Sequence, residues 1–140
     1  MYKKAISNKE FSIILANCNF LLEDKPSIAL CFSGGVDSLA LLILMKSWIK
    51  KKCGEITLVH FNHNLRRDSI YEEVFAKEIA RKFKVNCKIL SWEGQKPKMS
   101  IMEKARNKRY EKITQYCEKK KIITLMTAHH LDDCLETYLM

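Results

Sequence analysis

The segment Ser33-Gly34-Gly35-Val36-Asp37-Ser38 combines two adjacent glycines with hydroxyl and carboxylate groups, and it directly follows the apolar run Ile28 to Phe32. Adjacent glycines let a backbone turn tightly and leave its N–H groups unobstructed. The strongly apolar stretch that comes next is expected to form a helix, whose N-terminus attracts anions. The segment therefore predicts a phosphate-binding loop between a strand and a helix, in which Ser33 and Ser38 supply hydroxyl donors.

Asp37 is the unexpected member of this loop, because a carboxylate would repel bound phosphates. Its presence makes sense if Mg²⁺ sits between the carboxylate and the phosphates, since Mg²⁺ prefers oxygen ligands. The segment matches neither the G-x-x-x-x-G-K-[ST] pattern nor the dinucleotide pattern G-x-G-x-x-G. The simpler alternative is an ordinary Gly-Gly turn in which a serine or an aspartate caps the helix.

Two other apolar runs end in polar clusters. Ile56 to Phe61 overlaps the segment His60-Phe61-Asn62-His63-Asn64-Leu65-Arg66, and Ile122 to Thr127 leads into Ala128-His129-His130-Leu131-Asp132-Asp133. Taken alone, each histidine is more often a packing or loop residue than a catalyst. Two histidines beside two carboxylates at a helix start instead indicate a metal or a charged substrate, because one aspartate suffices to complement a helix dipole.

A basic segment runs from Glu103 to Tyr110. Its two arginines, Arg106 and Arg109, stand three residues apart and share one side of a helix, from which they could face phosphate. A solvated basic helix without a ligand is the alternative interpretation.

The elements that must position these residues alternate between helix and strand. Helices are expected over Ser7 to Asn19, Ser38 to Lys52, Ser69 to Lys84 and Ser100 to Lys120, and strands over Ile28 to Phe32, Ile56 to Phe61, Val85 to Leu90 and Ile122 to Thr127. Serine followed three residues later by glutamate predicts capping boxes at Ser7, Ser69 and Ser100. This alternation predicts an α/β fold, a parallel twisted sheet with helices on both faces, in which the polar clusters meet at the carboxyl edge.

Within the third expected helix, Val74, Phe75, Ile79 and Phe83 are expected to share one face, which would pack on the sheet.

Length and composition limit the class of protein. With 140 residues, 47% of them apolar, the chain suits one domain over residues 1–140. No apolar run approaches the ~18 residues of a membrane span, and the N-terminus lacks a secretory signal, so a cytoplasmic protein without a membrane partner is expected. Six cysteines without a C-x-x-C pair predict buried thiols instead of disulfides or a zinc site. The net charge of +9 is compatible with a nucleic-acid partner, but a lysine-rich composition alone also accounts for it.

The loop from Ser33 to Ser38 resembles the PP-loop of the N-type ATP pyrophosphatases, which grips the β,γ-phosphates of ATP while the α-phosphate is attacked. Together with His63-Asn64-Leu65-Arg66 and with the helix from Glu103 to Tyr110 that leads to His129-His130-Leu131-Asp132-Asp133, it resembles the tRNA(Ile)-lysidine synthetase family. The resemblance covers Ile28 to Met140. It departs from the family pattern at Asn64, where glycine is usual, and at Cys134, where glutamine is usual.

The resemblance implies a Rossmann-like PP-loop ATPase fold and a ligase reaction. ATP adenylates the C2 oxygen of the wobble cytidine in an isoleucine tRNA with a CAU anticodon, pyrophosphate leaves, and the ε-amine of free lysine then displaces AMP to give lysidine. The family's motifs imply ATP contacts along the loop from Ser33 to Ser38 and Mg²⁺ ligation by Asp37 and Asp133. They further imply catalytic roles for Asp37, Arg106, His130 and Asp133, and substrate contacts by His63, Arg66, Arg109, His129 and Asp132. DNA is not an expected partner.

Other interpretations stay open. Another PP-loop enzyme, such as a tRNA thiolase, an NAD synthetase or an amidating synthetase, would share the loop, although the closest thiolases use paired cysteines. A nucleotide-binding or RNA-binding module without turnover is the alternative from a different class. The chain stops at Met140 inside a helix expected to begin at Leu131, so we expect the N-terminal catalytic part of a longer protein, with tRNA-binding domains downstream.

Overall fold

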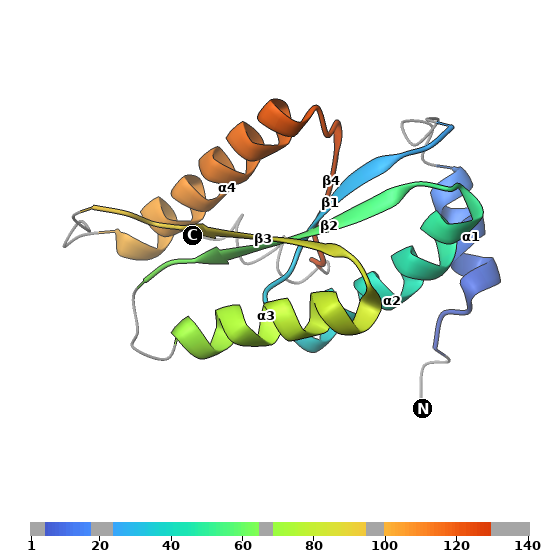
Figure 1. The fold of residues 1–140 in the computed structure, drawn as a ribbon, viewed down its shortest axis with the longest axis horizontal. Coiled ribbons are helices and arrows are strands. Elements are labelled where there is room, and N and C mark those ends of the chain that lie inside the picture. The colour runs from blue at the N-terminus through green and yellow to red at the C-terminus, as the bar shows by residue number, and fades with distance from the viewer. Residues whose placement is uncertain (1–4, 18–23, 65–68, 95–99, 130–140) are drawn as a thin grey trace.

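The computed structural model describes residues 5–17, 24–64, 69–94 and 100–129 of the 140-residue chain. In order, its elements are α1 (Asn8–Ala16), β1 (Ser27–Cys31), α2 (Val36–Lys51), β2 (Glu55–Asn62), α3 (Ser69–Phe83), β3 (Asn86–Ser91), α4 (Ile101–Lys120) and β4 (Thr124–Met126). Figure 1 shows their arrangement. The expected helices and strands up to the fourth strand are confirmed, with ends that differ by a few residues.

The four strands form one parallel sheet in the order β3-β2-β1-β4. The chain moves outward from β1 to β2 and β3, and α4 then returns it to the far side of β1. Leu30 of β1 lies opposite Leu58 of β2 and Met126 of β4. The strand order reverses between β1 and β4, and open α/β sheets bind ligands at the carboxyl ends beside such a reversal. The loop from Ser33 to Ser38 leaves the sheet at this point.

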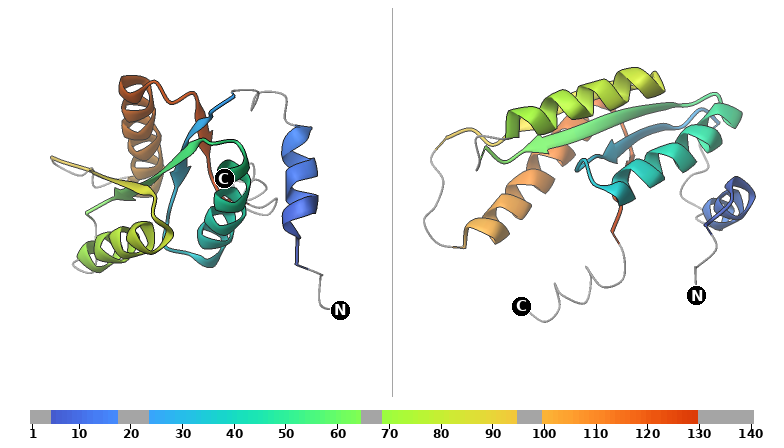
Figure 2. Two further views of the ribbon diagram at one scale, coloured as in Figure 1. Left: turned by 45° about the vertical axis from the view of Figure 1, so that its right-hand side comes forward. Right: turned by 90° about the horizontal axis from the view of Figure 1, so that it is seen from below.

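Helices cover both faces of the sheet, as expected. Figures 1 and 2 show α4 on one face and α2 and α3 on the other, with α1 next to α2. Alternate residues of β1 serve the two faces, because Ile28 and Leu30 pack with α2, whereas Ala29 belongs to the cluster that contains Ile113 of α4. A central strand buried on both sides is typical of a parallel sheet between helix layers. Leu42 and Met45 of α2 are fully buried, and each such side chain stabilises the fold by ~1.5–3 kcal/mol.

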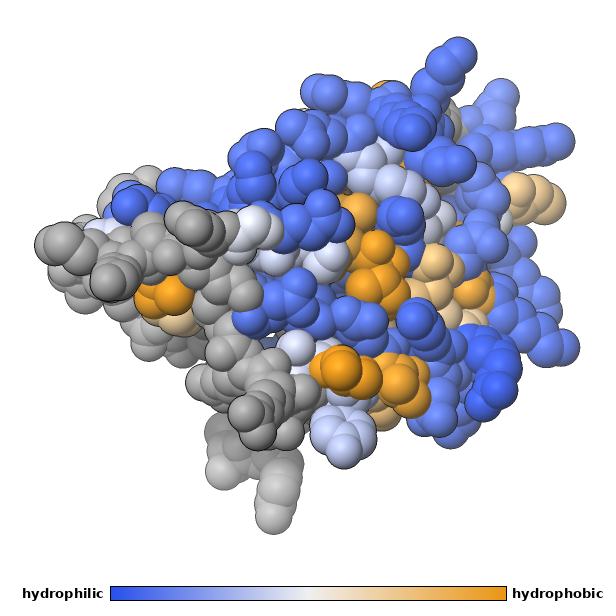
Figure 3. Space-filling view, turned by 60° about the vertical axis from the view of Figure 1, so that its left-hand side comes forward, coloured by the Kyte–Doolittle hydropathy of each residue, from blue (hydrophilic) through white to orange (hydrophobic). Residues whose placement is uncertain are grey.

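The apolar face predicted for α3 is partly wrong. Ile79 and Phe83 pack against the core, but Val74 and Phe75 are exposed, at 47% and 40%. The fully covered residues of α3 are Ala76 and Ala80, whose small side chains let the helix approach the sheet closely. The rotation that brings these alanines inward places positions 74 and 75 at the surface. Figure 3 shows exposed hydrophobic residues set among hydrophilic ones on one face of the molecule.

The three predicted capping boxes have different outcomes. At Ser7 the box is confirmed, because the Ser7 N–H donates to Glu10 Oε2 at 2.8 Å and the Glu10 N–H donates to Ser7 Oγ at 3.2 Å. At Ser100 the prediction is wrong: the backbone is left-handed, with φ of 52°, and the side chain makes no capping bond. A capping hydroxyl reaches the first-turn N–H groups from an extended backbone. Ser69 is the first helical residue of α3 rather than the residue before it.

Of the four described cysteines, only Cys117 is buried as predicted. Among the cysteines that the structure describes, Cys31 and Cys87 are half-buried and Cys53 is exposed, and all four are free. Cys53 follows α2 in a left-handed conformation with φ of 52°, which carries it to the surface. Cys18, Cys134 and the helix expected from Leu131 lie outside the described residues. Within the described ranges, every helix is too short or too polar to cross a membrane.

Candidate nucleotide-binding site

The loop between β1 and α2 is organised by its two serine hydroxyls. The Gly35 N–H donates to Ser33 Oγ at 3.3 Å, and Ser38 Oγ donates to the Gly35 carbonyl at 2.8 Å. The two hydroxyl oxygens lie 3.3 Å apart. Ser38 is buried and uses its proton inside the loop, whereas Ser33 is exposed. Of the two hydroxyls predicted to meet phosphate, that of Ser33 therefore has the direct access.

The N-terminus of α2 is capped by Gly35, which has extended backbone angles and no side chain to bond the first turn. The alternative interpretation of the loop, a serine or aspartate cap on an ordinary turn, is therefore wrong. The first N–H groups of a helix lack intrahelical partners, and together with the helix dipole they form an anion site. This geometry suits a phosphate.

Gly34 is required by its backbone conformation, since its φ is +85°, a value that residues with a side chain rarely adopt. A Cβ at this position would meet the Phe75 ring at an ordinary contact distance of 3.7 Å, so the constraint is conformational and not steric. Phe75 of α3 therefore lies against the loop, and its ring centroid is 6.0 Å from that of Phe32. This contact accounts for the surface position of an aromatic residue predicted to lie in the core.

Asp37 lies in the first turn of α2 with an exposed side chain. Mg²⁺ is usually bound in proteins through one or two carboxylates together with substrate phosphates and water. A single solvent-accessible carboxylate beside the anion site fits that pattern. Asp133, the second predicted ligand, lies outside the described residues, as do Arg66, His130 and Asp132.

A cavity of about 170 Å³ opens beside the loop, at the carboxyl ends of β1, β2 and β4. Acidic, basic, uncharged polar and apolar side chains all line it. They are Cys31, Phe32, Ser33, Ser38, Val59, His60, Phe61, His63, Glu72, Arg109, Ile113, Thr127, Ala128 and His129. The structure thus brings together the loop serines and three predicted substrate contacts, namely His63, Arg109 and His129.

His63 is held as a neutral ring. Its pKa is lowered from the ordinary histidine value, chiefly by burial and also by the positive charge of Arg109, while Glu72 opposes the shift. The ring packs edge-on against Phe61, with centroids 4.9 Å apart. Its Nδ1 is buried and has no hydrogen-bond partner among the described residues. A neutral imidazole in a cavity can accept a proton or a hydrogen bond from a ligand.

His129 is oriented by its neighbour on the same strand end, because its Nδ1 lies 2.8 Å from Thr127 Oγ1. His129 is exposed at the cavity wall. Thr127 was predicted only as the end of a strand, and its role in fixing this ring is visible only in the structure.

The two arginines of α4 have different surroundings. Arg109 lines the cavity and is half-buried, whereas Arg106 is exposed and does not belong to the lining. Both guanidinium groups lie over the ring of Tyr110, with carbon-to-centroid distances of 5.0 Å for Arg109 and 6.0 Å for Arg106. The positive charge of Arg109 reaches His63 and Cys31, which confirms its place among the cavity groups.

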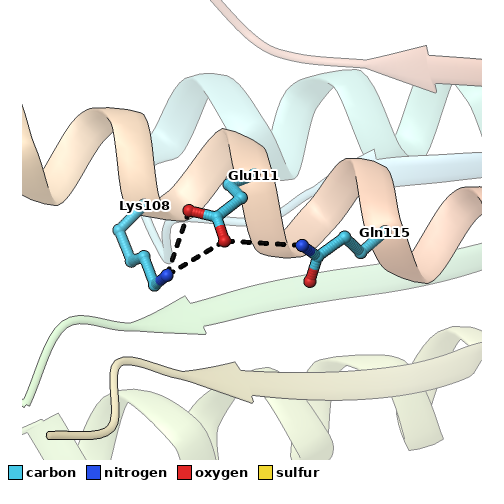
Figure 4. A network of polar contacts seen from close by, with 3 residues as sticks. All are labelled: Lys108, Glu111 and Gln115. Atoms are coloured by element: carbon cyan, nitrogen blue, oxygen red, sulfur yellow. Dashed lines mark hydrogen bonds and ion pairs between the residues drawn. The ribbon is translucent and has the colours of Figure 1, made fainter.

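The remaining basic character of α4 is partly local. Lys108 donates to both carboxylate oxygens of Glu111 at 3.0 Å, and Gln115 donates to the same carboxylate at 3.4 Å (Figure 4). Such an exposed pair adds little stability. The alternative of a solvated basic helix therefore describes this side of α4, while Arg109 faces the cavity.

The backbone conformation at position 64 explains why asparagine can stand where the family usually has glycine. Its backbone is left-handed, with φ of 50°, and glycine and asparagine are the residues that tolerate this conformation best. Its N–H donates to Asn62 Oδ1 at 2.7 Å, and its side chain donates to the Trp92 carbonyl at 3.2 Å. Asparagine therefore keeps the loop shape for which glycine is usual.

Among the cavity residues that were not predicted as site residues are His60 and Glu72. His60 was seen only as part of a histidine-rich segment, and Glu72 only as a helix-capping residue. For His60, the available signal is strand periodicity, which places it on the same side of β2 as the buried residue Leu58. For Glu72 no local pattern separates a cap from a cavity residue.

Comparison with known proteins identifies the same loop and fold. The family described as the PP-loop domain matches residues 4–140. A U34-tRNA thiolase, NcsA, from Methanococcus maripaludis, solved with its [4Fe-4S] cluster, superposes with a TM-score of 0.76 over 89% of this chain and 46% of its own. At 18% identity, this likeness concerns the fold alone.

Relatives found by sequence comparison have higher identities to this chain than the thiolase does. The tRNA(Ile)-lysidine synthase of Orientia tsutsugamushi is 38% identical over 83% of this chain, that of Bartonella henselae 41% over 81%, and that of Persephonella marina 37% over 86%. The chain spans about a quarter of the length of these relatives, at 26%, 23% and 28%. The match over residues 4–140, together with the loop geometry, shows that the chain belongs to the PP-loop domain family.

Proposed function

We propose that the chain is the ATP-binding catalytic part of a tRNA(Ile)-lysidine synthase. The observation that carries this proposal is the N-terminus of α2, which has a glycine cap and no side-chain capping bond, beside a cavity lined by His63, Arg109 and His129. The relatives named above support the choice of reaction. The substrates are ATP, free lysine and an isoleucine tRNA with a CAU anticodon.

In the first step, the C2 oxygen of the wobble cytidine attacks the α-phosphorus of ATP, the bond to the β-phosphate bridge breaks, and pyrophosphate leaves. The loop from Ser33 to Ser38 holds the β- and γ-phosphates. Asp37, with Asp133, would hold Mg²⁺, which would neutralise charge on the phosphate oxygens. Arg109 adds fixed positive charge at the cavity, where it favours developing negative charge.

In the second step, the ε-amine of lysine attacks C2, the C2–O bond breaks, and AMP leaves. The amine must be uncharged to attack and must lose a proton afterwards. The ring of His63 can accept it, because burial favours the unprotonated ring and its Nδ1 has no hydrogen-bond partner among the described residues. Arg106, His130 and Asp133 are the further catalytic candidates, and Arg66, His129 and Asp132 are the further substrate contacts.

A tRNA thiolase is the alternative that the thiolase-like fold raises. Sulfur transfer through a cysteine needs a thiolate. Cys31 is the cysteine in the cavity lining, and burial raises its pKa to about 11. This raised pKa favours lysine ligation over sulfur transfer.

The test uses the full-length protein with ATP, radiolabelled lysine and isoleucine tRNA bearing a CAU anticodon. Label is expected in this tRNA, together with AMP and pyrophosphate. Methionine tRNA, with the same anticodon, is expected to stay unlabelled, since the body of the tRNA is also read. Glutamine, ammonia or a sulfur donor in place of lysine should give no product. Cleavage of ATP to AMP without tRNA, or sulfur in the base, would contradict the assignment and leave only the PP-loop family.

A further inference from the structure

His60 lies near the end of β2 and is 2% exposed. Its Nδ1 is 2.8 Å from the carbonyl oxygen of Phe32. A carbonyl oxygen only accepts hydrogen bonds, so Nδ1 must carry the proton and donate. In the neutral ring, this leaves Nε2 as an acceptor, and Nε2 is buried without a partner among the described residues. Among the described residues, the Phe32 carbonyl is therefore the hydrogen-bond partner of the ring.

Phe32 is the residue at which β1 leaves the sheet. The pairing of β1 with β2 extends to Cys31, which lies opposite Val59, and the Phe32 N–H still donates to the Val59 carbonyl at 3.0 Å. The next group along β1, the Phe32 carbonyl, accepts from the imidazole of His60 instead of continuing the ladder through main-chain N–H groups. The backbone is thereby held by β2 on both sides of the Phe32 Cα. The residue that follows is Ser33, where the phosphate loop begins.

The Phe32 side chain is held as well. It is 2% exposed, and its ring contacts Phe75, which also lies beside Gly34 of the loop. The imidazole therefore fixes the backbone of a residue whose side chain is already anchored on α3. Removing the Nδ1 donor would leave a buried carbonyl unsatisfied, and the strand end would shift to recover a partner.

We propose that His60 is a positioning residue, whose Nδ1–H holds the Phe32 carbonyl and so sets the direction in which the loop from Ser33 to Ser38 leaves the sheet. His60 acts through Phe32 and not by touching the phosphates. The inference rests on the nucleotide binding proposed for this loop. It assigns the loop's geometry to one side-chain bond as well as to its glycines.

Two isosteric replacements in the full-length protein separate the ring nitrogens. In His60→Asn, the amide nitrogen occupies the position of Nδ1 and can still donate to Phe32, but nothing replaces Nε2. In His60→Gln, the amide occupies the position of Nε2, and the bond to Phe32 is lost. Calorimetric affinities for ATP, pyrophosphate and AMP are measured for both variants and the wild type, with thermal unfolding as the check on folding.

His60→Gln is expected to bind ATP and pyrophosphate about tenfold more weakly, and AMP nearly as the wild type does, because the β,γ-phosphates depend on the loop. His60→Asn is expected to restore most of that affinity. A loss confined to His60→Asn would overturn the proposal in favour of a ligand contact at Nε2, and equal losses in both variants would overturn it because the Nδ1 donor would then not matter. Equal losses for AMP and ATP, or no loss in either variant, would also overturn it.

The tautomer gives a readout that needs no variant. Nitrogen-15 NMR of histidine-labelled wild-type protein should find Nδ1 protonated and Nε2 unprotonated in His60. A proton on Nε2 alone would exclude the bond to Phe32 and with it the proposal. A wild-type protein that binds neither ATP nor pyrophosphate would instead refute the proposed function, while the NMR result would still decide the bond.

Discussion

The side-chain oxygen of Asn62 accepts the backbone N–H of Asn64 at 2.7 Å, and this bond closes the turn that follows β2. Asn62 is itself buried, and its amide nitrogen donates to Glu73 of α3 at 2.5 Å. The turn is therefore fixed to both the sheet and the neighbouring helix. It holds Asn64 in a left-handed conformation. The cavity residue His63 lies between the two bonded asparagines, so its backbone is fixed by the same turn.

This relationship predicts how position 64 responds to substitution. Asn64→Gly and Asn64→Val both lose the amide that donates to the Trp92 carbonyl, so the difference between them reports the backbone alone. A β-branched residue is strained at a φ of 50°, and the valine variant should be about 1–2 kcal/mol less stable than the glycine variant. Denaturant unfolding of the two variants measures this difference. Equal free energies of unfolding would mean that the turn relaxes to another conformation.

The second prediction concerns Asp37. Because its carboxylate is exposed in the first turn of α2, Asp37→Ala should abolish Mg²⁺-dependent ATP binding and leave the melting temperature unchanged. Asp24→Ala is the matched control, since Asp24 is also exposed but precedes β1, at the opposite end of the sheet. Calorimetry with and without Mg²⁺ measures both variants. Unchanged ATP affinity in Asp37→Ala would remove the metal role.

The third prediction separates strain from function at two glycines. Gly34 and Gly94 have similar positive φ values, 85° and 91°, but only Gly34 lies in the loop from Ser33 to Ser38, for which phosphate binding is proposed. Substitution of either by alanine should lower the free energy of unfolding by about 1 kcal/mol, because alanine is strained in this region. Only Gly34→Ala should weaken ATP binding. If Gly94→Ala weakened it equally, the effect would be one of general stability.

The fourth prediction follows from the lowered pKa of His63. The unfolded chain, whose histidine titrates near the ordinary value of 6.5, binds this proton more tightly than the folded protein does. The contribution of His63 to stability is therefore present above pH 6.5 and is lost as the pH falls through the lower folded pKa. His63→Gln should make the free energy of unfolding less dependent on pH in that window.

His129→Gln serves as the control for this measurement, because His129 is exposed at the cavity wall. Denaturant unfolding at several pH values between about 4 and 8 covers the range in which histidines titrate. An unchanged pH dependence in His63→Gln would show that His63 is not the group responsible.

The fold could be predicted from the sequence because apolar runs and capping signals are local. Ile28 to Phe32 is a short apolar run before Gly34, and such a run has few alternatives to a buried strand. The rotation of α3 could not be predicted, since it depends on how closely Ala76 and Ala80 approach the sheet. The local pattern at Ser100 predicts a cap, yet the chain enters α4 through a left-handed residue. The rotation of α3 and the backbone at Ser100 both depend on tertiary packing, which the local sequence does not define.

In the candidate site, too, local features could be predicted from the sequence and tertiary contacts could not. The loop from Ser33 to Ser38 could be predicted because adjacent glycines, hydroxyl groups and a following helix are local features that indicate an anion site. The bond between His60 and Phe32 joins residues 28 positions apart and leaves no mark in either local sequence. The choice between Arg106 and Arg109 also depends on the rotation of a helix about its axis, which a spacing of three residues does not define.

The last prediction tests that choice. Arg106 and Arg109 lie on the same helix and over the same ring of Tyr110, so their replacement by alanine removes equal charge from nearly the same place. Arg109 lines the cavity, and its charge reaches His63, whereas Arg106 is exposed outside the lining. A guanidinium that stabilises developing phosphate charge is worth about a hundredfold in rate. We therefore expect Arg109→Ala to lower kcat/KM for lysine transfer by about that factor and Arg106→Ala by much less. Initial rates of pyrophosphate release and of lysine incorporation, measured with full-length variants of equal melting temperature, decide between them. A larger loss in Arg106→Ala would show that Arg106, which lies outside the cavity lining, is the more important arginine for the reaction, and would contradict the choice of Arg109.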